Sequence, residues 1–197
     1  MLRNKSSLVL LAAALFASSH LAAQSDQAII EKALTPLPEE LRADATVYRY
    51  DDDGNRVTLK VGSNHVECSP TNADGFTRCG PVSQRARRDL QAKLSAQGLE
   101  GEDMQMAMQQ AEDEGRIPAR RFGQMAYRRF DTPERIQYLM VVSLPFATAE
   151  DLGMSSAFGR DNALLGKGTP FMMRSGTAGA HLMIPINGTE YSNQPPN

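Results

Sequence analysis

The sequence predicts an α+β fold, a single domain in which a mostly antiparallel sheet is interrupted by a two-helix insertion. Three observations support this prediction. Apolar and polar residues alternate strictly over 56–61, as in a half-buried strand. Apolar residues recur at helical spacing over 83–115. Two apolar runs, 138–144 and 181–186, then return the chain to strands.

The first 23 residues have the pattern of a secretory signal peptide. Arg3 and Lys5 supply a cationic start, and the apolar run 8–17 is too short to span a bilayer comfortably. Small residues precede Gln24, and no acidic residue interrupts the segment. We therefore expect residues 1–23 to be removed during export.

Export places the mature chain in the periplasm or outside the cell. No later run is apolar enough to cross a membrane, so no stable membrane insertion is expected. The predicted organisation is a single globular domain over 24–190 and a flexible tail over 191–197.

Export also gives the two cysteines a meaning. Cys68 and Cys79 are the only cysteines, and an oxidising compartment favours a disulfide between such an isolated pair. The enclosed segment 69–78 is rich in turn-forming residues, which predicts a stapled surface loop. A redox pair is the alternative, but the two-residue spacing of redox motifs is absent.

Charge excludes nucleic acid as a partner. The chain holds 21 Lys and Arg against 23 Asp and Glu, a formal net charge of −2. No region has the basic excess that phosphate-backbone binding requires. The only arginine-rich run is 85–88, and the spacing of Arg85 and Asp89 predicts a helical ion pair on a solvated face.

The N-terminal half reads as a short helix followed by strands. A helix over 25–34 begins at a Ser25 cap and ends before Pro36. Strands over 46–50 and 56–61 flank an Asp-Gly turn, with Val57, Leu59 and Val61 facing one way. Residues 65–68 continue the meander, with Val66 and Cys68 inward.

Two helices follow. The first is capped by Ser83, closes at Gly98 and carries an apolar stripe of Ala86, Leu90 and Leu94. The second ends before Gly115 and places Met104, Met108 and Ala111 on one face. Such methionines usually fill a core, although thioethers in an exported protein are also soft ligands for Cu(I).

The last third contains a central strand and a hairpin. The run 138–144 is apolar at both parities, which predicts a strand covered on both faces. Thr148 and Asp151 have capping-box spacing. Residues 170–174 and 181–186 flank a turn of small residues and predict a hairpin.

Two blocks resemble a family of uncharacterised exported bacterial proteins. One is Gly62-Ser63-Asn64 followed by Cys68 and Cys79; the other is Gly176-Thr177 followed by His181-Leu182-Met183-Ile184-Pro185. The resemblance covers Val47–Pro81 and Pro170–Ile186. The chain departs from that pattern in having Val66-Glu67 where the family has an aromatic residue before the first Cys. The resemblance implies a shared exported domain and no catalytic residue.

The C-terminal hairpin supplies the candidate site. If Arg174 lies opposite His181, then Met172 lies opposite Met183 and all four side chains share a face. Arg174 and His181 could then bind a small anion. Met172, His181 and Met183 could hold Cu(I), a soft metal. The ordinary alternative is a packed sheet face.

A hydrolase is a third hypothesis. Outside the leader only His65 and His181 could act as a base, and Ser175 lies near His181 in the predicted hairpin. No G-x-S-x-G motif accompanies them, so no pattern nominates an enzymatic reaction. The sequence therefore predicts an exported binding or structural module stabilised by one disulfide, and it indicates no cofactor.

Overall fold

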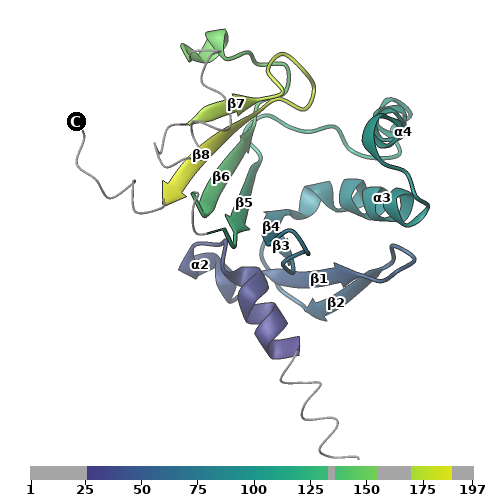
Figure 1. Ribbon diagram of the computed structural model, residues 1–197, viewed down its shortest axis with the longest axis vertical. Coiled ribbons are helices and arrows are strands. Elements are labelled where there is room, and N and C mark those ends of the chain that lie inside the picture. Colours follow the sequence, from purple (N-terminus) through teal and green to yellow (C-terminus); the bar gives the residue numbers. More distant parts are fainter. Residues whose placement is uncertain (1–25, 133–135, 155–169, 188–197) are drawn as a thin grey trace, which may run out of the picture.

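The structure, a computed structural model, describes residues 26–132, 136–154 and 170–187. They form one eight-stranded sheet in the order β2-β1-β3-β4-β5-β6-β8-β7 (Figure 1). All neighbouring strands are antiparallel except β1 and β3. The strands are β1 (Thr46–Tyr50), β2 (Arg56–Lys60), β3 (Val66–Ser69), β4 (Phe76–Pro81), β5 (Met125–Phe130), β6 (Tyr138–Ser143), β7 (Phe171–Met173) and β8 (His181–Asn187). The predicted α+β fold is confirmed, whereas the predicted leader and tail lie outside the described residues.

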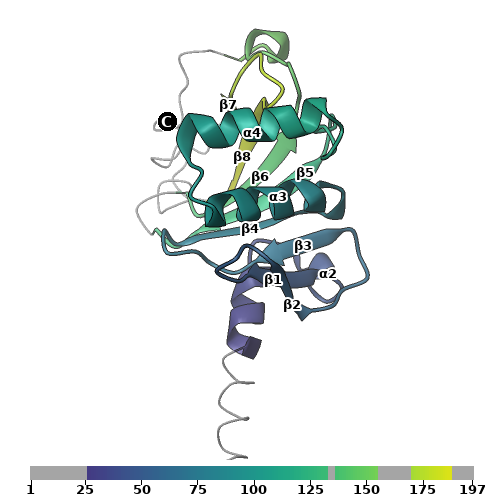
Figure 2. The same ribbon diagram turned by 90° about the vertical axis from the view of Figure 1, so that its right-hand side faces the viewer.

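Helices cover both faces of this sheet. A helix over 26–34 and α2 (Glu39–Arg42) pack on what we call the back face. The insertion between β4 and β5 consists of the 3-10 turn η1 (Val82–Gln84), α3 (Arg85–Ala96) and α4 (Gly101–Asp113). Both α-helices of the insertion lie over the opposite, front face, and Figure 2 shows α4 crossing in front of β5, β6 and β8. The predicted two-helix insertion is thus confirmed.

The predicted meander is wrong at its third strand. The β1–β2 hairpin forms as expected, but β3 pairs in parallel with β1 rather than with β2. The chain can cross at Gly62 because a Cβ there would lie only 2.3 Å from the carbonyl oxygen of Asp44. Pairing with β1 buries Val66 and Cys68 as predicted, whereas Val61 lies beyond the end of the edge strand β2 and is 84 % exposed.

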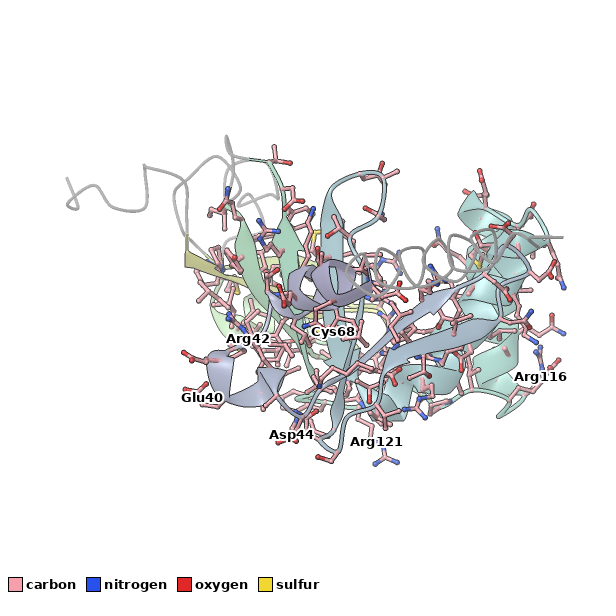
Figure 3. The ribbon with its side chains drawn as sticks, turned by 90° about the horizontal axis from the view of Figure 1, so that it is seen from below. Glu40, Arg42, Asp44, Cys68, Arg116 and Arg121 are labelled. Carbon is pink, nitrogen blue, oxygen red and sulfur yellow. A yellow bond between two sulfur atoms is a disulfide. The ribbon has the colours of Figure 1, made fainter. Side chains whose placement is uncertain are left out.

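A disulfide joins Cys68 and Cys79, as the sequence predicted. The two residues lie directly opposite on β3 and β4, and the predicted surface loop is the turn 70–75 of the hairpin that these strands form. Both are fully buried in the core of the back face, beside Val47 and Ala33. Figure 3 shows Cys68 inside the molecule beside the helix over 26–34. The disulfide therefore holds the core together as well as the hairpin.

The front face differs from the prediction for α3. Ala86 is exposed and Ser83 makes no cap, because η1 precedes the helix and Gln84 stands at the N-cap position. Arg88 is the buried residue of α3. Its guanidinium lies over Gly80, where a Cβ would come within 3.2 Å of Nη1. A charged residue thus occupies the place where an apolar stripe was expected.

Arg88 belongs to a buried ion-pair network that we call the Glu67 cluster. Glu67 on β3 is 1 % exposed and pairs with Arg88, with Arg85 at 2.9 Å and with Arg56 at 3.2 Å. Asp89 pairs with Arg56 at 2.6 Å and accepts a hydrogen bond from the Tyr50 hydroxyl. The predicted Arg85–Asp89 pair is therefore replaced by contacts from α3 to the sheet.

The segment 138–152 follows the prediction more closely. Thr148 and Asp151 exchange the reciprocal hydrogen bonds of a capping box at the short 3-10 turn η2 (Glu150–Leu152). Strand β6 buries Leu139 and Val141 on the front face, but its back-face residues are only half-buried. No helix in the described parts of the chain is long and apolar enough to cross a membrane.

Candidate functional site

A cleft of about 350 Å³ lies between the front face of the sheet and α3. Most of its polar lining is cationic. The charged and ionisable residues that line it are Arg78, Arg87, Arg88, Arg120, Arg128, Arg174 and His181. We call this the arginine cleft.

Two of these arginines come from the sheet itself. Arg78 on β4 and Arg128 on β5 lie directly opposite each other across the two strands. Like charges in such a pair destabilise a sheet. The Nε atom of Arg128 is buried without a hydrogen-bond partner, and one Nη lies 3.7 Å from the thioether of Met183. The guanidinium carbon lies 5.8 Å from the centre of the Phe76 ring. Burial, together with repulsion from Arg78, Arg120 and Arg174, lowers the pKa of Arg128 to about 10.

Two more arginines come from the segments that close the end of the cleft. Arg120 precedes β5, and Arg174 follows β7 in a left-handed conformation with φ 54°. Both guanidinium groups lie beside Gly179, where a Cβ would come within 3.3 Å of an Nη atom of each. Burial and repulsion from Arg87 and Arg174 also lower the pKa of Arg120. The backbone thus accepts strain at Arg174 and places two like charges side by side.

The arginines of α3 are held differently. Arg87 pairs with Glu112 of α4 and donates to the carbonyl of Pro118 at 3.0 Å. Gln84 donates to Gln124 at 3.1 Å, which ties the segment before β5 to the start of α3. Arg88 is neutralised in the Glu67 cluster. These contacts fix the helical wall of the cleft.

The remaining arginines have no such compensation. Within the described ranges, no carboxylate is in salt-bridge contact with Arg78, Arg120, Arg128 or Arg174. Arg174 is exposed, whereas Arg78, Arg120 and Arg128 are half-buried, and a half-buried charge without a partner raises the free energy of the folded state. An anion in the cleft would remove that cost. Planar guanidinium groups also match the oxygens of carboxylates and phosphates in two-pronged hydrogen bonds.

His181 lies at the start of β8 and is 9 % exposed. Its Nδ1 lies 2.8 Å from the carbonyl oxygen of Gly179, so Nδ1 carries the proton and donates. Nε2 is buried without a hydrogen-bond partner. Burial lowers the pKa of His181 and the nearby Arg128, Arg120 and Arg174 lower it further, although the Gly179 hydrogen bond partly offsets this. The ring is therefore neutral at pH 7.

The predicted register of the C-terminal hairpin is wrong by one residue. Met173 lies opposite His181, and Met172 lies opposite Leu182. Since side chains alternate between faces, Met172 points to the back face while His181 and Met183 remain on the front. Arg174 lies beyond the end of β7, yet both Arg174 and His181 line the same cleft.

These positions bear on the two other hypotheses for His181. The predicted set of Met172, His181 and Met183 does not share a face, and the surrounding arginines would repel a cuprous ion. For the hydrolase hypothesis, the hydroxyl of Ser175 accepts a hydrogen bond from Ala149 N at 3.0 Å, and no described hydroxyl contacts Nε2 of His181. The geometry favours neither chemistry over anion binding.

Sequence reasoning found Arg174 and His181 but missed Arg78, Arg120 and Arg128. The reason is that β4 and β5 were not predicted as strands. Alternation carried a usable signal, because Arg78 has the parity opposite to the buried Cys79, and Arg128 the parity opposite to the buried Tyr127. That signal places both arginines on one face, although it does not pair them.

Comparison of the chain with protein-family models, with curated proteins and with solved structures finds no match.

Proposed function

We propose that this protein is an exported binding module whose ligand carries an anionic group, held in the arginine cleft. The observation that carries this proposal is the pair of Arg78 and Arg128, which face each other across β4 and β5. Among the described residues, no carboxylate is in salt-bridge contact with either of them. If these two positions served only for packing, replacing either charge with an apolar side chain would increase the stability of the folded state. Retaining both is understandable where a ligand neutralises them.

The rest of the cleft supports the same class of ligand. Arg120 and Arg174 add two further positive charges beside Gly179, at the end of the cleft. His181 is neutral at pH 7, so the positive charge of the cleft comes from its arginines. The strained backbone of Arg174 is the kind of local cost that concentrates at binding sites.

The test is calorimetric titration of the purified protein with inorganic phosphate and with sulfate. We expect saturable binding of at least one of them, and a rise in Tm with anion concentration because the anion binds the folded state only. Arg128→Gln should weaken binding at least tenfold, since it removes a cation of the cleft that has no carboxylate in salt-bridge contact among the described residues.

Arg49→Gln is the matched control. Arg49 is an exposed strand arginine on β1, outside the cleft, and its loss changes net charge by the same amount. Binding should survive this substitution. Equal losses in the two variants, or no binding of either anion to the unmodified protein, would contradict the proposal.

Export has its own support and its own test. The buried disulfide is of a kind that forms in oxidising compartments, and residues 1–23 have the composition of a signal peptide. Protein isolated from its native cells should begin near Gln24 and show no free thiol. Full-length chain resident in the cytosol with two titratable thiols would contradict export.

A further inference from the structure

The arginine cleft continues into a second cavity. This cavity, of about 430 Å³, lies between α3, α4 and the turn before β8. The two cavities share Arg87, Gln91, Arg120 and Arg174 in their linings. A ligand seated among the arginines can therefore extend toward α4.

Methionine forms the wall of the second cavity. Met104 and Met108 lie one turn apart on α4, both half-buried, and both line this space. Neither belongs to the hydrophobic clusters found among the described residues, so the expected role in core filling is not observed. Between them in sequence, Met106 points away and is 63 % exposed.

Such a wall suits a flexible apolar group. Methionine side chains are unbranched and polarizable, and they adapt to ligands of variable shape. The same cavity is bordered by the amides of Gln105 and Gln109 and by the Arg87–Glu112 ion pair. Apart from these polar groups and the shared arginines, the methionines are the large apolar side chains that a ligand would meet there.

Size separates an inorganic ion from a larger ligand. Sites for organic molecules of drug size typically measure about 300–1,000 Å³. Each of the two cavities reaches that range, at about 350 and 430 Å³. A phosphate or sulfate ion alone would occupy the arginine end and leave the methionine wall in contact with water.

We infer that the ligand is an organic anion with an unbranched alkyl chain, its head group among the arginines and its chain along Met104 and Met108 of α4. This inference rests on the proposed function, because the arginine cleft must hold the head group. It adds the chemical class of the remainder of the molecule and the helix that contacts it.

The test is a series of monoalkyl phosphates, from methyl to butyl to hexyl phosphate, titrated calorimetrically into the purified protein. All three carry the same head group. The dissociation constant should fall as the chain lengthens, by about fourfold for each methylene that becomes fully buried. Methyl phosphate serves as the head-group reference.

The double substitution Met104→Gln with Met108→Gln should flatten this dependence and leave the affinity for methyl phosphate unchanged. Glutamine matches methionine in length and in helix propensity, so α4 should still form. Met106→Gln is the control on the same helix, and it should change neither quantity, since Met106 points away from the cavity.

Each outcome bears on a different claim. If all three phosphates bind with one affinity, the alkyl chain is wrong and the anion-binding proposal stands. If chain-length dependence persists in the double variant, the methionine wall is wrong. If no phosphate binds at all, the proposed function itself fails.

Discussion

The Glu67 cluster and the arginine cleft lie side by side on the front face, and both are built mainly from arginine. In the first, each of Arg56, Arg85 and Arg88 contacts a carboxylate, that of Glu67 or Asp89. In the second, no described carboxylate touches the arginines that come from the strands and the closing segments. In the first arrangement every arginine has a carboxylate partner, whereas in the second these arginines have none among the described residues. That difference is the reason for assigning a structural role to the first set of arginines and the proposed binding role to the second.

The largest effect is expected at Glu67. Glu67→Gln keeps the size of the side chain but leaves Arg56, Arg85 and Arg88 around a neutral amide. Breaking a buried ion pair by removing one partner costs about 3–5 kcal/mol. Urea unfolding should show a loss of that order. A loss below about 1 kcal/mol would mean that Glu67 does not stabilise the arginines around it, and the contrast with the cleft would fail.

The disulfide links the two regions, because Cys68 neighbours Glu67 and Cys79 neighbours Arg78. Replacing both cysteines with serine should cost about 2–4 kcal/mol of unfolding free energy. Anion affinity should change little, since neither cysteine lines the cleft. The check is to measure unfolding and phosphate titration on one preparation. A large loss of affinity would show that the cleft depends on the disulfide for its shape.

Arginine substitutions compare the two regions directly. Arg128→Gln should lower the free energy of unfolding by no more than about 1 kcal/mol, or raise it. The reason is that the substitution removes a charge that has no carboxylate partner among the described residues. Arg88→Gln removes a partner of Glu67 and should destabilise strongly. Urea unfolding without added anion measures both. Equal destabilisation in the two variants would show that the arginines of the Glu67 cluster and of the arginine cleft do not differ in their contribution to stability.

The smallest effect concerns pH. The pKa of His181 is below its ordinary value, so below about pH 6.5 the unfolded chain takes up a proton that the folded chain does not. Lowering the pH through this range therefore destabilises the free protein. A bound anion favours the protonated ring against Arg120, Arg128 and Arg174, which raises this pKa in the complex.

Sulfate affinity should consequently rise severalfold between pH 7 and pH 5. Sulfate is the appropriate probe because its own charge stays constant across that range. In His181→Gln the dependence should disappear. A pH profile of the same slope in that variant would assign the proton uptake to another group.

Sequence reasoning reached furthest where the signal is local. The β1–β2 hairpin follows from strict alternation around an Asp-Gly turn, and Asp51 accepts hydrogen bonds from Asn55 N and Asp53 N within that turn. The ends of α3 and α4 follow from Gly98 and Gly115, which both adopt positive φ. Such features depend on neighbours in the chain and need no knowledge of the rest of the molecule.

The candidate site was less predictable from the sequence than these local features. Arg174 and His181 were identified, but through a register in which they faced each other. A one-residue shift moves every side chain of a strand to the other face, and nothing local to this hairpin specifies the shift. The same limit concealed Arg78 and Arg128, whose juxtaposition requires two strands separated by the helical insertion to pair.

By itself, the sequence determined the fold class, the disulfide partners and the presence of a helical pair between strands, because composition, cysteine count and residue periodicity encode these directly.

Tertiary structure alone decided which arginines have a carboxylate partner. Ion pairing depends on distances between segments far apart in the chain, such as β3 with α3, or β4 with β5. Those distances follow from packing the two faces of the sheet. Burial of apolar side chains fixes the positions of the segments and thereby decides which charged groups come into contact.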